Sequence, residues 1–173
     1  MHPPSQRQSS MYFQFVDQLN ASPARGRFFF LPYNPTHLDR IEISQPEIIA
    51  ASQVMDVARM IDGQAEMGPS ATAFLDGKPV AVFGMVPIWT GVGEAWMIAD
   101  DLARQRPIRM TKLARTVMDI LMISQRLRRL QITVRTTDRR AVKWGRAIGF
   151  EQEAVLKAYG PDGVDYLMMA RWT

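Results

Sequence analysis

The 173-residue sequence contains no cysteine and only two histidines, His2 and His37. The lack of cysteine excludes disulfide bonds and thiolate metal sites, and two histidines are too few for a histidine-rich metal site or a histidine relay. No apolar run approaches the roughly 20 residues of a membrane-spanning helix. The first ten residues also lack the apolar segment of a signal peptide. We therefore expect a protein that works in a cytoplasm or is packed into a particle assembled there.

Acidic residues are scarce between Arg104 and Arg146. This span holds thirteen Lys and Arg but only two acids, Asp119 and Asp138, so its net charge is +11 while the rest of the chain carries −7. Such asymmetry attracts a phosphate-bearing ligand, nucleic acid or an acidic partner surface. Solvated helix faces explain it equally well, because no aromatic and basic nucleic-acid motif accompanies the charge.

The chain divides by composition into an N-terminal extension, residues 1–35, and a domain, residues 36–173. Residues 1–10 predict no regular structure, and residues 11–20 predict a short helix or strand. The three consecutive phenylalanines at 28–30 are not easily left in water, so they either pack on the domain or form a docking surface.

The domain shows strand-like and helix-like patterns in alternation. Ser44 and Glu47 are spaced as a capping box at a helix start, Asp76-Gly77 is a strong hairpin signal, and Gly149 is typical of a helix end. The expected elements are a strand at 38–43, a helix at 46–62, strands at 71–75, 79–86 and 93–98, a helix around 110–121, a strand at 130–134, a helix at 138–148, and strands at 150–159 and 164–172. This order predicts a mixed α/β (α+β) domain with one central sheet flanked by helices.

The segment RRAVKWGRAIGFEQEAVLKAYGPDGVDYLMMAR resembles the end of the GNAT N-acetyltransferase family. Proteins of that family commonly end with a helix, a Gly-Phe corner, a Glu-x-x-hydrophobic strand, a turn and a Tyr-x-hydrophobic strand. The matching positions are Ala141, Gly149, Phe150, Glu153, Val155, Tyr166 and Leu167. The order of elements from Leu38 to Arg171 is also similar, so the resemblance implies the acyl-CoA N-acyltransferase fold, with a mostly antiparallel sheet, over residues 36–173.

A narrower resemblance lies in VFGMVPIWTGVGEAWMIADDL and in the IGFE and YGPDGVDY segments. These are similar to divergent GNAT-like proteins of tailed bacteriophages and prophages, some of which are thought to be structural. The resemblance implies a virion or host-cytoplasm location, with other phage structural proteins as partners of the N-terminal extension and of the basic region 104–146. It also implies an oligomer or a part of a larger assembly.

Acetyl-CoA binding in this family uses the backbone of the fourth strand, here Met97, Ile98 and Ala99, and a glycine-containing phosphate loop before the next helix. Glycine lets the backbone approach the phosphates. In this chain the loop pattern falls on Arg104 to Arg109, with Pro107, which has no N–H, and Arg109 at the glycine positions. A register shifted by two places Arg109 and Thr111 there. The side chains of Arg104, Arg106 and Arg109, with the helix start at Met110 and Thr111, are the alternative phosphate ligands.

Catalytic residues in this family include a tyrosine that protonates the leaving thiolate and a carboxylate that deprotonates the amine. The tyrosine position falls on Gly145, which has no proton to give and otherwise serves to let its helix lie close to a neighbour. Asp138 holds the usual asparagine position, and Tyr159 and Tyr166 lie on later strands. Glu94 is the candidate base, followed by Asp100 and Asp101. Trp89 and Trp96 either line an acceptor pocket or pack in the core.

Three functions follow from these residues. With both the loop and the acid altered, we expect a virion structural or assembly component with no cofactor, a pseudoenzyme rather than an efficient enzyme. The alternative is an N-acetyltransferase that uses acetyl-CoA and acts on a protein or small-molecule amine. A nucleic-acid-binding regulator is the third, and it rests on the charge alone.

Overall fold

The computed structural model describes residues 6–100 and 107–173, and these form one seven-stranded sheet with helices on both faces. The strands lie in the order β1-β2-β3-β4-β5-β7-β6, and every neighbouring pair is antiparallel except β4 and β5. Their bounds are β1 Phe28–Pro32, β2 Ser70–Leu75, β3 Lys78–Trp89, β4 Val92–Ala99, β5 Arg129–Arg135, β6 Glu151–Leu156 and β7 Tyr166–Trp172. The predicted mixed fold with a mostly antiparallel sheet is confirmed.

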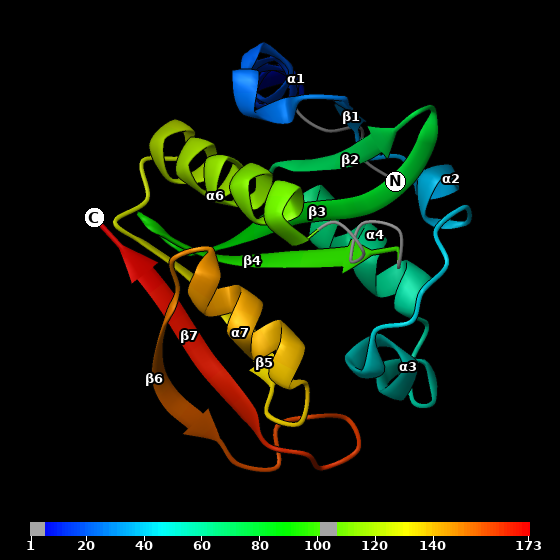
Figure 1. Cartoon of the computed structure of the whole chain (residues 1–173), viewed down its shortest axis with the longest axis vertical. Helices are drawn as coiled ribbons and strands as arrows, with labels where there is room; N and C mark the ends of the chain where they lie inside the picture. The colour runs from blue at the N-terminus through cyan, green and yellow to red at the C-terminus, as the bar shows by residue number, and fades with distance from the viewer. Residues whose placement is uncertain (1–5, 101–106) are drawn as a thin grey trace.

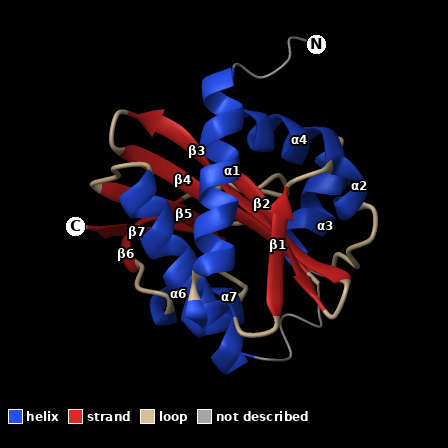
Figure 2. Cartoon of the chain, turned by 90° about the horizontal axis from the view of Figure 1, so that it is seen from above, coloured by secondary structure: helices blue, strands red, loops and turns tan. Residues whose placement is uncertain are grey.

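Six helices and one short 3₁₀ turn connect the strands in the described chain (Figure 1). They are α1 Gln6–Ala21, η1 Pro23–Arg25, α2 Pro35–Leu38, α3 Pro46–Ser52, α4 Val57–Met67, α6 Pro107–Ser124 and α7 Arg139–Ala147. Figure 2 shows α1, α6 and α7 on one face of the sheet and α2, α3 and α4 on the other. None of the helices in the described part of the chain is long and apolar enough to cross a membrane.

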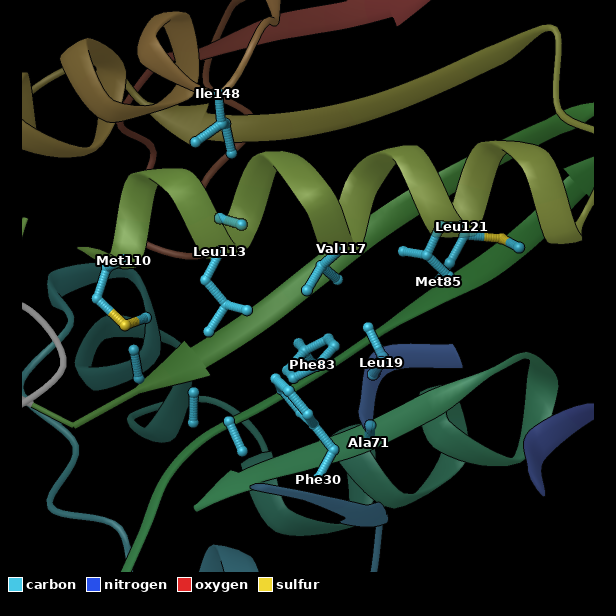
Figure 3. Close-up of a cluster of buried hydrophobic side chains, with 14 of the residues drawn as sticks. Leu19, Phe30, Ala71, Phe83, Met85, Met110, Leu113, Val117, Leu121 and Ile148 are labelled. Carbon is cyan, nitrogen blue, oxygen red and sulfur yellow. The ribbon is translucent and has the colours of Figure 1, made fainter. Parts of the chain in front are cut away.

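The larger core lies between the sheet and the helices α1 and α6. Helix α6 presents Met110, Leu113, Val117 and Leu121 to β3 at intervals of three and four residues, which places them on one side of a helix (Figure 3). The rings of Phe30 and Phe83 meet edge to face there, with centroids 6.1 Å apart. A smaller cluster of Leu38, Ile41, Ala51, Val57, Ile61, Val82 and Ile98 joins α2, α3 and α4 to the other face.

Local sequence signals explain several elements. Asp76 and Gly77 both have positive φ, 51° and 78°, and form the predicted hairpin turn between β2 and β3. Asp138 begins α7 by accepting a hydrogen bond from the Ala141 N–H at 2.9 Å. Gly149, at φ 97°, follows the end of α7 as predicted.

The predictions for the first seventy residues need correction. Residues 38–43 do not form a strand, because only Ile43 makes a bridge, to Asp100. The first strand is β1, which pairs with β2, and its Phe28 and Phe30 are buried while Phe29 is half exposed. The described part of the predicted extension thus contributes β1 and the core residues of α1 to the same sheet and core.

The predicted helix at 46–62 is two helices, α3 and α4, because the chain turns at 53–56 and Asp56 begins α4 by accepting from the Arg59 N–H. Helix α4 also continues past the predicted end at residue 62, through Gly63, to Met67. The predicted capping box at Ser44 is also wrong, since Gln45 is the residue that begins α3. The strands predicted at 79–86 and 93–98 are longer in the structure, because β3 extends to Trp89 and β4 begins at Val92.

Candidate active site

The strands β4 and β5 separate after a short paired stretch. They pair in parallel over three positions only, from Val92 with Arg129 to Glu94 with Gln131. The remaining residues of β4 and β5 are not paired with each other. Figure 1 shows the two strands diverging beyond this point. The separation leaves one edge of β4 without a neighbouring strand over its last residues.

A cleft of about 610 Å³ occupies the space between the two strands and is lined from both faces of the sheet. This volume lies within the range of small-molecule binding sites in proteins. From the α6 and α7 side the lining includes Met97, Met110, Leu113, Ala114, Val117, Met118, Ala141, Trp144, Gly145 and Ile148. From the α3 and α4 side it includes Ile48, Ala51, Met55, Met60, Ile61, Gln64, Glu94, Trp96, Tyr159, Pro161 and Tyr166.

Glu94, the predicted base, lies where β4 and β5 part. Its Oε2 accepts a hydrogen bond of 2.9 Å from the Nε2 of Gln131. The Oε1 of Gln131 accepts in turn from the Nε of Arg129 at 3.2 Å, so the amide orientation that serves Glu94 is fixed by a donor on its other side. Sequence reasoning identified Glu94 but not its partner, because Gln131 comes from a strand 37 residues away.

Arg129 is itself held by Glu153 of β6, the residue matched by the family pattern. Its guanidinium donates to both carboxylate oxygens, with an NH1 to Oε1 distance of 2.8 Å. This hydrogen bond raises the pKa of Arg129 and lowers the pKa of Glu153. Four side chains on three strands therefore form one hydrogen-bonded chain that ends at the Glu94 carboxylate.

The side-chain amide of Gln45, at the start of α3, occupies the open edge of β4. Its Nε2 donates to the Met97 carbonyl at 3.3 Å, and its Oε1 accepts from the Ala99 N–H at 2.8 Å. The Asp100 N–H donates to the Val80 carbonyl of β3. In this part of β4 the backbone N–H and C=O groups of even-numbered residues therefore point toward β3, and those of odd-numbered residues point toward the opening. Gln45 thus bonds to the strand in the way a further strand or an extended amide would, and no local sequence pattern indicates this contact.

The residues predicted to bind acetyl-CoA fall into three groups. Met97 and Ala99 direct backbone groups at the opening, whereas the buried Ile98 faces the α3 and α4 side. Met110 is buried and lines the cleft, Thr111 is half buried and Arg109 is exposed. Helix α6 begins at Pro107, and Arg104, Arg106 and Asp101 lie outside the described residues.

Gly145 lies against β5 and β7, inside the cleft lining. A Cβ there would lie 3.2 Å from the sulfur of Met169 and 3.4 Å from the Cδ1 of Ile132. These distances are tighter than ordinary contacts, so glycine lets α7 lie close to the sheet. The structural explanation predicted for Gly145 therefore has direct support in the packing.

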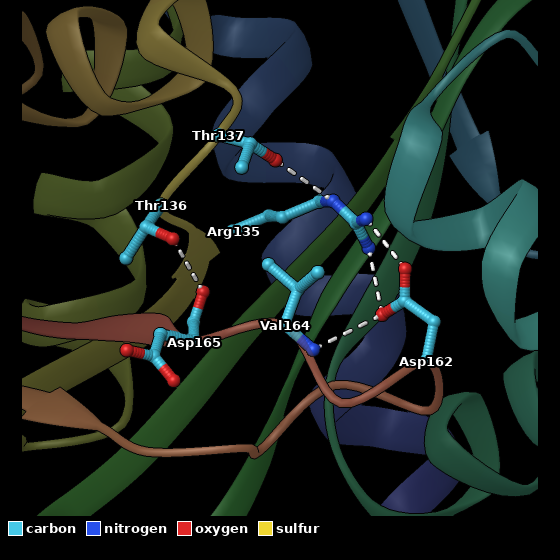
Figure 4. Close-up of polar contacts among 6 residues, drawn as sticks. All are labelled: Arg135, Thr136, Thr137, Asp162, Val164 and Asp165. Atoms are coloured by element: carbon cyan, nitrogen blue, oxygen red, sulfur yellow. Dashed lines mark hydrogen bonds and ion pairs between the residues drawn. The ribbon is translucent and has the colours of Figure 1, made fainter.

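The two later tyrosines both reach the cleft, which sequence order did not reveal. Tyr166 is buried on β7 and Tyr159 is half exposed in the loop before it, with ring centroids 5.4 Å apart. Arg135 holds this loop through two bonds to Asp162, and Thr136 bonds to the carbonyl of Asp165 (Figure 4). Hydrogen bonds from Arg135 and Lys157 lower the pKa values of Asp162 and Asp165.

The other predicted candidates lie elsewhere or pack against neighbours. Asp100 is buried outside the cleft lining and accepts a bond from the Glu42 N–H. Trp89 is exposed at the end of β3. Trp96 lines the cleft, and its ring meets the ring of Tyr33 edge to face. The Trp96 Nε1 is buried with no hydrogen-bond partner among the described residues. The described residues contain no group of three His, Asp or Glu arranged to hold a metal.

Comparisons with known proteins find similarity in structure alone. No protein-family model matches the sequence, and no curated protein matches it. Ard1 from Thermoplasma volcanium is similar with a TM-score of 0.66 and 16% identity, over 85% of this chain and 98% of that one. RimL, a ribosomal alpha-N-protein acetyltransferase in complex with coenzyme A, has a TM-score of 0.67 and 14% identity, over 87% and 96%.

A GNAT family acetyltransferase from Elizabethkingia anophelis with acetyl-CoA bound has a TM-score of 0.63 and 12% identity, over 86% of this chain and 99% of that one. All three structures match over 96% or more of their own length. This chain therefore has the fold of the GNAT N-acetyltransferases.

Proposed function

We propose that this protein is an acetyl-CoA-dependent N-acetyltransferase that modifies a primary amine of a protein or small molecule. The observation that carries the proposal is the position of Glu94. Its carboxylate lies where β4 and β5 part, it lines the cleft, and a hydrogen-bonded chain fixes its partner Gln131. A carboxylate at such a junction is placed to accept the proton of an amine.

The open edge of β4 fits the amide-bearing arm of acetyl-CoA. Met97 and Ala99 offer a carbonyl and an N–H toward the opening, and the side chains of α6 and α7 form an apolar wall beside them. Acetyl-CoA supplies an acetyl group activated as a thioester. At the start of α6, Pro107 offers no N–H, so Arg109, which is exposed, is the residue of the described chain that would hold a phosphate there.

On the amine side, Glu94 holds the ammonium by charge and accepts its proton, so that the nitrogen gains a free electron pair for attack on the acetyl carbon. Gln131 keeps the carboxylate turned to the opening. Gly145 supplies no proton to the departing sulfur. Because a thiol has an ordinary pKa of about 8.5, the thiolate leaves without a protein acid. General acids typically contribute about 10²–10⁴-fold, so we expect slow turnover.

The test is calorimetric titration with acetyl-CoA, followed by mass spectrometry of amine acetylation by the wild type and Glu94→Gln. We expect binding by both proteins and at least a roughly 100-fold lower rate for the variant. Thr116→Ala, at a half-buried position of α6 outside the cleft lining whose only described side-chain bond is to the Lys112 carbonyl, serves as the control. Absence of binding at millimolar acetyl-CoA contradicts the proposal.

A second candidate function is a structural or assembly component of a bacteriophage virion. It is supported by the glycine at position 145, which removes the usual acid, and by the altered loop sequence around Pro107. Under this proposal the basic region 104–146 contacts other structural proteins or DNA. Within that region Arg129 and Arg135 are already paired with Glu153 and Asp162, so the exposed basic residues of α6 and α7 would make the contact. Failure to detect the chain by mass spectrometry of purified particles would contradict it.

A further inference from the structure

The described lining of the cleft contains one acidic side chain and no basic one. The acidic residue is Glu94, and the remaining side chains of the described lining are almost all apolar or aromatic. Its one described hydrogen bond comes from the uncharged Gln131, so a cation beside the carboxylate would supply the charge partner that the described lining does not. The cleft therefore complements one positive charge joined to an apolar body.

The α3 and α4 side of the cleft also exposes apolar side chains that no described residue covers. Met55, in the turn between α3 and α4, is 49% exposed, and Tyr159, in the loop between β6 and β7, is 54% exposed. Met60 and Ile48 also line the cleft, and both are partly buried. A ligand that fills the space between Met55 and Tyr159 would remove this apolar surface from water.

Building on the proposed function, we propose that the acceptor is a primary amine with one positive charge on an apolar side chain or ring. Its ammonium lies at Glu94, and its apolar body lies between the α3–α4 turn and the loop of Tyr159 and Pro161. Free arylalkylamines and peptides that begin with a large apolar residue share this chemistry. A peptide α-amine has an ordinary pKa of about 7.7–8.0, lower than that of a lysine side chain, so more of it is unprotonated at neutral pH.

The same lining disfavours acceptors with several charges. A polyamine, or a lysine in a basic peptide, would bring additional cations into a cleft whose described lining offers them only the Glu94 carboxylate. Each cation without a partner there would lose its hydration without compensation. Discrimination against such amines thus comes from what the cleft lacks.

The experiment measures amine binding directly by calorimetry on the full chain, because binding needs no acetyl donor. The probes are 2-phenylethylamine, methylamine, spermidine and a tetrapeptide amide beginning with phenylalanine. We expect 2-phenylethylamine to bind at least about tenfold more tightly than methylamine, as each buried methylene contributes 10–200-fold in such pockets. If the peptide binds more tightly than 2-phenylethylamine, the acceptor is a peptide N-terminus. If the two bind equally, the ammonium and the apolar group of a free amine are sufficient for binding.

Two variants separate the charge from the apolar wall. Glu94→Gln should weaken all four probes, whereas Met55→Ser should weaken 2-phenylethylamine by about tenfold and leave methylamine unchanged. Met67→Ser, an equally exposed methionine at the end of α4 and outside the cleft lining, is the matched control and should change nothing. Preference for spermidine, or equal effects of the two methionine variants, overturns the inference even if acetyl-CoA is bound and transferred. Conversely, selective binding of apolar amines without acetyl-CoA binding overturns only the proposed function.

Discussion

Replacing Gln45 by alanine tests how the open edge of β4 is used. The wild-type side-chain amide bonds to the Met97 carbonyl and to the Ala99 N–H, and Gln45 is only 9% exposed. Each such bond contributes about 0.5–1.5 kcal/mol net, so we expect the free energy of unfolding to fall by about 2 kcal/mol. Urea denaturation measures this loss.

The same variant should bind acetyl-CoA more tightly. If the arm of acetyl-CoA pairs with Met97 and Ala99, the wild type must first break the two bonds of Gln45, and the variant does not. A difference of about 1.4 kcal/mol is tenfold in the dissociation constant, so calorimetry should show about tenfold tighter binding by Gln45→Ala.

The control is Gln53→Ala, an exposed glutamine at the other end of α3. It should change stability by less than about 0.5 kcal/mol and leave acetyl-CoA affinity as it is. Two results would refute the reasoning about Gln45. Unchanged stability would mean that its two bonds contribute nothing, and weaker acetyl-CoA binding would mean that Gln45 holds the ligand rather than competing with it.

Further predictions concern the Glu94 partner, a crowded glycine and the loop acids. Gln131→Leu should lower the acetylation rate while leaving acetyl-CoA affinity unchanged, since Gln131 orients Glu94; an unchanged rate would remove that role. Gly84→Ala should destabilise the fold by about 2 kcal/mol in thermal melts, because its Cβ would lie 2.7 Å from both the Pro69 carbonyl and the Trp96 ring. Gly63→Ala, with open space on α4, should instead stabilise by about 0.5–1 kcal/mol, and equal effects would contradict the packing argument. The pairing with Arg135 lowers the pKa of Asp162 below its usual 3.8. This pairing stabilises the loop above pH 3.8, and the stabilisation is lost as the pH falls through the lower pKa of the folded state. Hydrogen exchange of residues 157–165 should rise in that pH range, and no rise would argue against the pairing.

The elements that sequence predicted well depend on neighbouring residues. The turn at Asp76-Gly77, the start of α7 at Asp138 and the apolar side of α6 are all determined within a few residues, and all three are confirmed. The error at 38–43 has a different cause. Residues 28–32 and 38–43 both have strand-like patterns. Only residues 28–32 form a strand, because they pair with β2, which lies about 40 residues later in the chain.

The candidate site shows the same limit. Glu94 could be proposed as the base because a carboxylate at a strand start is visible in the sequence; the structure places it in the cleft lining, and its role as a base stays a prediction. Gln45 and Tyr166 line the cleft and Gln131 bonds to Glu94, and the sequence does not predict these contacts because each residue comes from a distant part of the chain. Topology brings them together, and no local pattern records it.

The cleft crosses the sheet, and this has a kinetic consequence. Side chains of both faces line it, so under the proposed function acetyl-CoA along β4 and an amine at Glu94 would occupy it at the same time. With no cysteine in the chain, no protein thiol is available to carry the acetyl group between two separate binding events. We therefore expect initial-rate plots at several fixed acetyl-CoA concentrations to intersect, as they do when a ternary complex forms before the first product leaves.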